Sequence, residues 1–276
     1  MSSYLITRID DFGSARAAND AILSILNAGN FIKNVSCMAA SPHIDQGAEQ
    51  LERIRKEGKL CIGLHATLNS EWDYVKFLPI CPPDEIPSLV DDKGMFQLHP
   101  MFFSERMPEV EEAMREISAQ LDYLTRLRLT IEYIDSHMLP DATIPGLKEA
   151  LSEFARKKGL VDQRWFYTFS SRHQPMLTGE KALEEDTQDY GEWFLSFLEG
   201  HQYINIFHPA YLRRETQLFQ NQFLKGGGVA KSRDAERRLL CSGAFDRLCE
   251  EHQVLTLKYT EAKPQGDTTE IAAKNF

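Results

Sequence analysis

Residues 4–13 of the chain read YLITRIDDFG. The first six of these residues form a mostly apolar run that is typical of a buried β-strand. Asp10 and Asp11 follow this run directly, and Ser14 stands where its side chain can cap a helix that ends near Gly29. The stretch therefore predicts a strand, two carboxylates at its carboxyl end, and a helix immediately afterwards.

Further strand patterns follow this one along the chain. Several are almost continuously apolar, as expected for strands that are covered on both faces. Counting the first, the predicted strands are residues 4–9, 34–40, 60–67, 132–136, 164–169, 203–207 and 254–259. Helical patterns separate many of them: one begins at Pro108, two include residues 147–155 and 189–198, and a late one begins at Ser232.

This alternation of strands and helices favours a parallel sheet with right-handed crossovers. We therefore predict an α/β fold, a (β/α) barrel of about seven parallel strands that is fully or incompletely closed. We expect one domain over residues 1–262 and a polar tail over residues 263–276.

Two long segments, residues 69–106 and 209–231, do not fit the alternation of strands and helices. Long loops in compact domains are often functional, although either segment can equally be a solvated excursion. Three glycines at 226–228 lie in the second segment. They lack the Lys-Ser/Thr pair of a phosphate-binding loop, and we interpret them as a flexible hinge.

The composition is that of an ordinary globular chain, with 42% hydrophobic and 26% charged residues. The formal net charge of −10 provides no basic face for nucleic acid. No apolar run reaches the ~18 residues that a membrane span needs, and Asp10 and Asp11 precede any signal-peptide core. We therefore expect a cytoplasmic protein with no nucleic-acid or membrane partner. Five cysteines without CxxC spacing indicate reduced thiols: Cys37, Cys61, Cys81, Cys241 and Cys249.

Ionisable residues stand at the carboxyl ends of four predicted strands. Asp10 and Asp11 end the first strand, His65 lies near the end of the third, and His137 and His208 follow the fourth and the sixth. The carboxyl ends of parallel barrel strands meet on one face, where active sites are built. One carboxylate and two imidazoles suit a divalent metal and leave positions open for water, while a second carboxylate can take a proton.

Other polar and aromatic residues carry weaker signals. His99 lies in the first long segment, where we expect a surface histidine, and Arg233 and Glu236 have the i,i+3 spacing of a surface salt bridge. Three aromatic side chains in the same long segment either stack on a sugar or pack the loop: Trp72, Tyr74 and Phe77.

Six short motifs occur in a fixed order over nearly the whole chain. They are residues 9–13 (IDDFG), 62–65 (IGLH), 86–91 (IPSLVD) with Gly94 and Phe96, 135–137 (DSH), 207–209 (FHP), and 232–233 (SR) with Glu236. In this order and at these separations they resemble the YdjC-like carbohydrate deacetylase family, which includes chitooligosaccharide deacetylases.

The resemblance implies a deacetylase-type (β/α) barrel, a homodimer, and a divalent metal on Asp11, His65 and His137. The family suggests Mg²⁺, and Zn²⁺ is chemically plausible for such donors. By analogy with polysaccharide deacetylases, Asp10 is the expected general base, and His208 is our choice of general acid. The expected reaction is removal of an N-acetyl group from a small acetylated carbohydrate, an amino sugar or a short oligosaccharide.

The chain departs from the family pattern near the second metal histidine. The usual Thr-His-x-Asp-Ser-His-x-His has Glu132 and Tyr133 in place of its first pair and Leu139 in place of its last histidine, and Ala210 replaces a glycine after the late His-Pro. Two alternatives stay open: another metal-dependent amide or ester hydrolase on the same barrel, and a catalytically silent carbohydrate-binding relative. A two-His-one-carboxylate iron oxygenase also matches the donor set, but the strand–helix alternation argues against its usual all-β scaffold.

Overall fold

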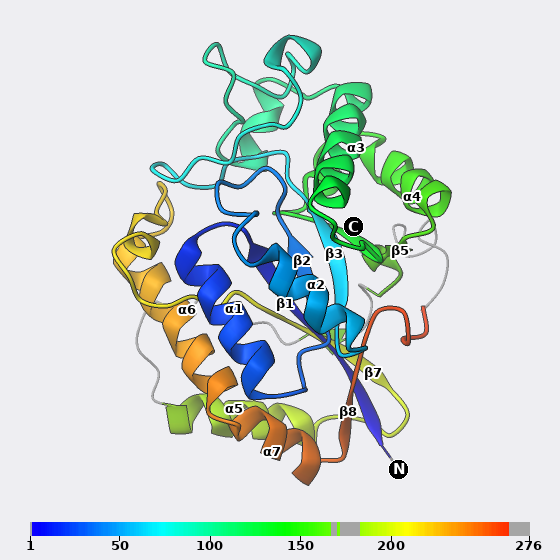
Figure 1. The fold of residues 1–276 in the computed structure, drawn as a ribbon, viewed down its shortest axis with the longest axis vertical. Helices are drawn as coiled ribbons and strands as arrows, with labels where there is room; N and C mark the ends of the chain where they lie inside the picture. Colours follow the sequence, from blue (N-terminus) through cyan, green and yellow to red (C-terminus); the bar gives the residue numbers. More distant parts are fainter. Residues whose placement is uncertain (1, 167–169, 172–182, 265–276) are drawn as a thin grey trace.

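The computed structural model describes residues 2–166, 170–171 and 183–264. Strands and helices alternate along these residues, and the long segment between the third strand and the third helix lies above the carboxyl ends of the strands (Figure 1). The strands are β1 (Ser3–Phe12), β2 (Asn34–Cys37), β3 (Cys61–Ala66), β4 (Tyr133–Ser136), β5 (Val161–Asp162), β6 (Ser170–Ser171), β7 (Gln202–Phe207) and β8 (Val254–Leu257).

These strands form one parallel sheet with the order β5-β4-β3-β2-β1-β7-β6. Strand β1 is central: it pairs with β7 along one edge, and with β8 and then β2 along the other. In the part of the chain that the structure describes, β5 and β6 do not pair with each other, so the sheet is an open half-barrel. The predicted α/β fold with parallel strands and incomplete closure is confirmed.

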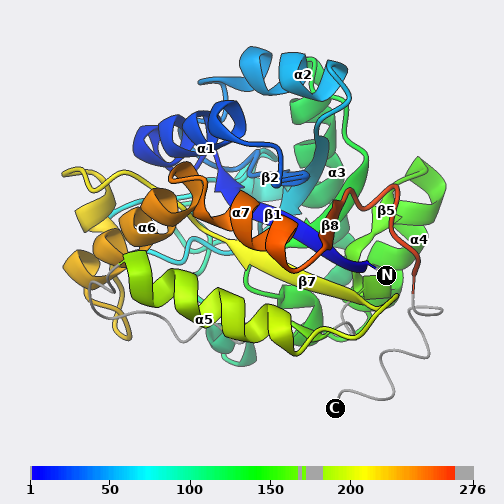
Figure 2. The same ribbon diagram turned by 90° about the horizontal axis from the view of Figure 1, so that it is seen from below.

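Helices surround this sheet, with α1 and α2 on one side of β1 and α5 on the other (Figure 2). The α-helices are α1 (Arg16–Ala28), α2 (Ala48–Lys56), α3 (Val110–Arg126), α4 (Leu147–Lys158), α5 (Leu183–Leu195), α6 (Gly226–Cys241) and α7 (Ala244–Glu251). Single 3₁₀ turns span Pro83–Glu85, Pro100–Ser104, Pro140–Ala142, Gln163–Phe166 and Thr216–Leu218. In α3, Ala113, Ile117 and Leu124 are fully buried, and their helical spacing puts them on one face against β3.

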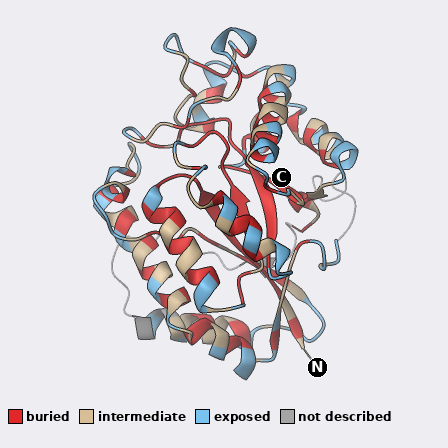
Figure 3. Cartoon of the chain, in the orientation of Figure 1, coloured by how far each residue is buried: buried red, intermediate tan, exposed pale blue. Residues whose placement is uncertain are grey.

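The core lies between the strands and these helix faces. Figure 3 shows the central strands buried and the outer helix faces exposed. None of the described helices is both long and apolar enough to cross a membrane. All five cysteines are free thiols, as the sequence predicts.

The predicted start of the first helix is wrong by one position. The N-cap of α1 is Ala15, with no side-chain cap bond, and the buried Ser14 hydroxyl has no hydrogen-bond partner among the residues that the structure describes. The reason is that Asn19, inside the helix, accepts a 2.7 Å hydrogen bond from the Gly13 amide and organises this turn instead.

The predicted glycine hinge and the predicted helix start at Ser232 are also wrong. The three glycines form the first turn of α6, which begins at Gly226 and carries Ser232 in its interior. A Cβ atom at Gly226 would collide with the backbone carbonyl of Gln217. Glycine is therefore needed because the helix starts in close contact with the preceding 3₁₀ turn.

The predicted strand at residues 164–169 is not found where the structure describes it. Residues 164–166 belong to a 3₁₀ turn, and 167–169 lie outside the described residues. Asp162 accepts hydrogen bonds from the backbone amide and the guanidinium of Arg164, which turns the chain after only two residues of β5. Most of the predicted tail, from residue 265 onward, also lies outside the described residues.

Candidate metal centre

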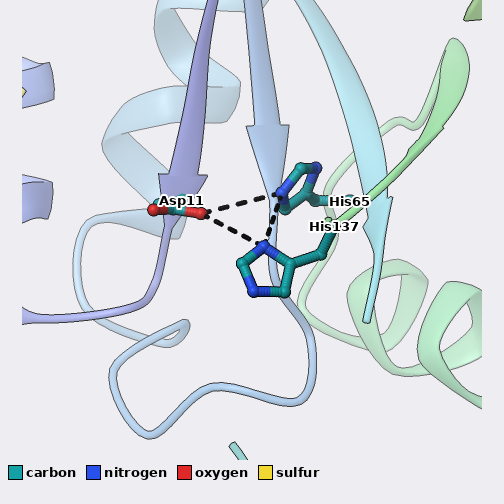
Figure 4. A group of neighbouring side chains, drawn as sticks. All are labelled: Asp11, His65 and His137. Carbon is teal, nitrogen blue, oxygen red and sulfur yellow. Dashed lines mark hydrogen bonds and ion pairs between the residues drawn. The ribbon is translucent and has the colours of Figure 1, made fainter. Parts of the chain in front are cut away.

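Three side chains from β1, β3 and the end of β4 face one another at the carboxyl end of the sheet (Figure 4). Asp11 lies at the end of β1, His65 lies in β3, and His137 directly follows β4. Asp11 Oδ1 lies 3.6 Å from His65 Nε2 and 3.7 Å from His137 Nδ1, and the two nitrogens are 3.2 Å apart. The sequence prediction that these residues converge is therefore correct.

The three donor atoms fit a divalent metal ion. All three side chains are buried, and the donors form a compact group with one carboxylate oxygen and two imidazole nitrogens. Bonds of about 2.0–2.2 Å from one zinc or magnesium ion to two neighbouring donors hold those donors roughly 3 Å apart. The spacing and chemistry of Asp11, His65 and His137 therefore match one shared ion.

The backbone of Asp11 explains how two consecutive aspartates serve one site. Neighbouring side chains in a regular strand point to opposite faces. Here Asp11 has φ 67°, in the left-handed region, and the pairing with β2 shifts register between Ile9 and Phe12. This irregularity lets Asp10 approach His65 and Asp135 as a second group of potential donors, while Asp11 faces the two histidines.

Asp10 is held by a buried arginine two residues earlier on the same strand. The Arg8 guanidinium contacts both oxygens of Asp10, at 2.7 and 2.8 Å, and lies 3.0 Å from Asp135 Oδ2. Burial lowers the pKa of Arg8, but Asp10 and Asp135 raise it more, so it lies well above its usual value. Arg8 is therefore a permanent positive charge between two buried carboxylates.

His65 is oriented from behind by Asp135. His65 Nδ1 lies 2.7 Å from Asp135 Oδ1, so Nε2 is left to face Asp11 and His137. Ser36 donates a 2.6 Å hydrogen bond to the other oxygen of Asp135. Burial lowers the pKa of His65, but Asp135, Asp10 and Asp11 raise it to about 9.

His137 has a carboxylate neighbour from the long segment after β3. Its Nε2 lies 3.3 Å from Glu71 Oε2, and the ring of Phe77 packs edge-on against it. Among the aromatic candidates, Trp72 and Phe77 are fully buried and pack the loop, whereas Tyr74 is exposed.

The predicted general acid, His208, lies beside Asp10. His208 follows β7, its side chain is 41% exposed, and its Nε2 is 4.0 Å from Asp10 Oδ2. The His208 amide donates a 2.7 Å hydrogen bond to Glu236 Oε2, which ties this turn to α6. His208 is therefore near the centre without being one of the grouped donors.

The predicted surface salt bridge between Arg233 and Glu236 is wrong. Arg233 is buried and lies 2.8 Å from Asp11 Oδ2, with its guanidinium over the rings of Phe219 and Trp72. Burial raises the pKa of Asp11, but Arg233 and three histidines lower it well below its usual value. The i,i+3 spacing does not distinguish a surface salt bridge from a helix face that packs on a site, because the spacing is the same in both cases.

The weakest histidine candidate lies apart from the three donors. His99 is partly buried, its Nδ1 accepts a hydrogen bond from the Met101 amide, and its ring contacts Phe223 edge-on. It is therefore a loop-capping residue rather than a member of the donor group.

Arg8 and Asp135 are site residues that the sequence prediction missed, although each has a feature in the sequence by which it could have been found. Arg8 is a charge inside an apolar strand, placed two residues before Asp10 and so on the same face. Asp135 belongs to the motif that supplies His137, and in the sheet it is the register partner of His65. Buried charges need opposite charges beside them, and Arg8 lies between the carboxylates of Asp10 and Asp135.

The fold and the residues around this centre match a known family. Residues 4–251 match the profile of the YdjC-like proteins. The chain belongs to the YdjC-like family. Among its relatives, a carbohydrate deacetylase of Vibrio cholerae serotype O1 is 25% identical over 267 residues, covering 93% of this chain and 95% of the relative. A carbohydrate deacetylase of Enterococcus faecalis is 26% identical over 269 residues, covering 92% and 96%.

A solved structure has the same fold as this YdjC-like protein. It is a putative cellobiose-phosphate cleavage protein from Enterococcus faecalis V583, with a TM-score of 0.72 and 24% sequence identity. The match covers 94% of this chain and 98% of that one. The architecture is therefore shared over almost the full length of both chains.

The departures of this YdjC-like protein from the family pattern leave its three donors in place. Tyr133 is fully buried, with its hydroxyl 2.8 Å from Ser36 Oγ, and so adds to the support of Asp135. Leu139 is 42% exposed in a left-handed turn. The Ala210 amide donates to the Arg233 carbonyl, which keeps the turn after His208 close to α6.

Proposed function

We propose that this YdjC-like protein hydrolyses the N-acetyl group of an amino sugar or short oligosaccharide, using a divalent metal ion on Asp11, His65 and His137. The observation that carries the proposal is the compact group of three buried donors, with their closest atoms 3.2–3.7 Å apart, beside Asp10 and His208. Full-length relatives named carbohydrate deacetylases support the choice of substrate.

The donor set suits more than one metal. Two imidazoles with one carboxylate match zinc better than magnesium, which prefers oxygen ligands, whereas the family suggests magnesium. When bound, a divalent ion polarises a carbonyl oxygen and lowers the pKa of a coordinated water. Metal analysis of the purified protein identifies the native ion.

Asp10 is the proposed general base. It accepts the proton of the water whose oxygen attacks the acetamide carbon, and it is suited to this because Arg8 fixes both of its oxygens in place. It lies outside the group of Asp11, His65 and His137, so in this proposal it takes the proton and does not bind the ion.

His208 is the proposed general acid. As the C–N bond breaks, its imidazolium gives a proton to the leaving nitrogen, so the products are acetate and a free amine. This transfer is needed because an unprotonated amide anion is a very poor leaving group near neutral pH. Its partly exposed side chain is accessible to a substrate that enters from solvent.

A substrate panel tests the proposed function. Protein loaded with Zn²⁺ or Mg²⁺ is incubated with N-acetylated mono- and oligosaccharides, an N-acetyl amino acid and an acetylated sugar ester, and released acetate and free amine are measured. Equal amounts of acetate and amine from an N-acetyl sugar support the proposal. Turnover of only the other amide or the ester indicates a different metal hydrolase, and sugar binding without turnover indicates a silent relative.

The homodimer and the cytoplasmic location are further parts of this proposal. Light scattering at micromolar concentration tests the first, and a mass near that of one 31.6 kDa chain contradicts it. Cell fractionation tests the second.

A further inference from the structure

Both candidate metal-binding histidines face a carboxylate through the ring nitrogen that points away from the centre. His65 Nδ1 lies 2.7 Å from Asp135, and His137 Nε2 lies 3.3 Å from Glu71. The two carboxylates come from different kinds of structure, because Asp135 lies in β4 and Glu71 lies in the long segment after β3. The second pair has no role in the proposed chemistry so far.

The burial of the Glu71–His137 pair indicates that the contact is specific. The side chains are 13% and 5% exposed. Within residues 2–166, 170–171 and 183–264, neither Glu71 Oε2 nor His137 Nε2 forms a hydrogen bond, so the 3.3 Å contact between them is an electrostatic one. A buried polar atom without a hydrogen bond is costly, so each of these atoms depends on the charge contact with the other.

The backbone at Glu71 is held in a conformation that glycine adopts more easily. Its φ is 55°, in the left-handed region. Hydrogen bonds fix the loop on both sides: the Ser70 amide donates to the Gln97 carbonyl, and the Glu71 carbonyl accepts from Asn221 Nδ2. Strained backbone that is fixed by its surroundings occurs preferentially at functional sites. Here the strained residue is the one that delivers a carboxylate to His137.

We propose that Glu71 is a positioning residue for the metal centre: its carboxylate, 3.3 Å from His137 Nε2, keeps the ring proton on that nitrogen and so leaves Nδ1 free to bind the ion. This proposal rests on the proposed function, which places His137 among the metal ligands. A carboxylate on the far nitrogen fixes the tautomer and the ring orientation and makes the ligand more basic. Glu71 does for His137 from a loop what Asp135 does for His65 from a strand.

Two substitutions and a matched control test this role. Glu71→Gly removes the carboxylate and relieves the left-handed backbone, and Glu71→Gln keeps a neutral acceptor. Arg128→Gly is the control, because Arg128 is exposed, has φ 65°, and precedes the amino end of β4, at the opposite end of the sheet. Zn²⁺ binding to each full-length protein is measured by titration calorimetry, and the melting temperature is measured without metal.

We expect Arg128→Gly to melt at or above the wild-type temperature, because it relieves a left-handed residue. Glu71→Gly gains the same relief but leaves His137 Nε2 without its carboxylate, so it should melt near the wild-type temperature. Glu71→Gly should bind Zn²⁺ about 10–100-fold more weakly, Glu71→Gln less weakly than that, and Arg128→Gly as the wild type does. A loss below about threefold in Glu71→Gly, with its fold intact, overturns the positioning role while leaving the proposed function standing. Failure of the wild-type protein to bind Zn²⁺ counts instead against the metal centre itself.

Discussion

The strand side and the loop side of this centre are built differently. On the strand side, Arg8, His65 and Asp135 are buried and joined by contacts of 2.7–3.0 Å. On the loop side, the corresponding contacts of Glu71 and His208 are 3.3 and 4.0 Å, and His208 is partly exposed. The sheet thus fixes its groups through short contacts, while the surrounding segments hold theirs at longer distances and leave His208 open to a substrate.

Arg233 is the exception on the loop side. It comes from α6, yet it is buried and contacts Asp11 at 2.8 Å. Asp11 is therefore held between the two sides, with Oδ1 toward the histidines and Oδ2 toward Arg233. If this division is correct, loss of a donor on the strand side should abolish metal binding, and changes on the loop side should weaken it or affect turnover alone.

Loss of a strand-side donor should have the largest effect. His65→Ala removes one of three proposed protein ligands, so its metal affinity should fall by more than the roughly 100-fold that loss of a supporting residue costs. The fold should survive, because Asp135 keeps Arg8 and Ser36 as partners. Metal content after dialysis and circular dichroism measure the two effects.

His201→Ala is the matched control for this substitution, because His201 is exposed and precedes the amino end of β7. Full metal occupancy in His65→Ala would reject His65 as a ligand.

Asp10→Asn should separate metal binding from chemistry on the strand side. The substitution keeps the shape of the side chain but removes most of its basicity. Deacetylation should slow by 10²–10⁴-fold, roughly 3–5.5 kcal/mol of transition-state stabilisation, with metal affinity close to wild type. Single-turnover rates and calorimetry measure these quantities. If Asp10→Asn abolishes metal binding, the roles of Asp10 and Asp11 are reversed.

His208→Gln should slow turnover by up to a similar factor, but only for substrates with a poor leaving group. The amide needs a proton on its nitrogen, whereas an activated acetyl ester such as a nitrophenyl acetate does not. The measurement is the ratio of the amide rate to the ester rate in the variant and the wild type. Equal slowing of both substrates would remove His208 as the acid and leave it a role in substrate binding.

The difference between the two sides also decides what the sequence could predict. Asp11, His65 and His137 follow apolar runs, and a parallel sheet brings the ends of such runs together whatever the loops do. Asp135 could have been found by pairing the third and fourth predicted strands, which puts it beside His65. Glu71 and Arg233 could not, because their positions depend on how a loop and a helix pack over the sheet.

The irregular elements were unpredictable for related reasons. The start of α6 depends on a close contact between Gly226 and the backbone of Gln217, far from any local pattern. The short α2 (Ala48–Lys56) was missed because six of its nine residues are polar or charged. Its buried face contains only three apolar residues, Ala48, Leu51 and Ile54. Its apolar stripe is too narrow for a periodicity argument.

The smallest effect is expected at the contact between Arg233, on the loop side, and Asp11, a donor on the strand side. Arg233→Lys keeps the positive charge near Asp11 but loses the planar guanidinium that lies over Phe219 and Trp72. Asp11 should then be oriented less firmly, and Zn²⁺ should bind about tenfold more weakly, or roughly 1.4 kcal/mol. Arg238→Lys on the same helix is the control, because Arg238 is half-exposed and pairs only loosely with Asp234, at 3.5 Å. If calorimetry gives the same affinity for both variants, the Arg233–Asp11 contact does not orient the donor, and the strand side holds Asp11 without help from α6.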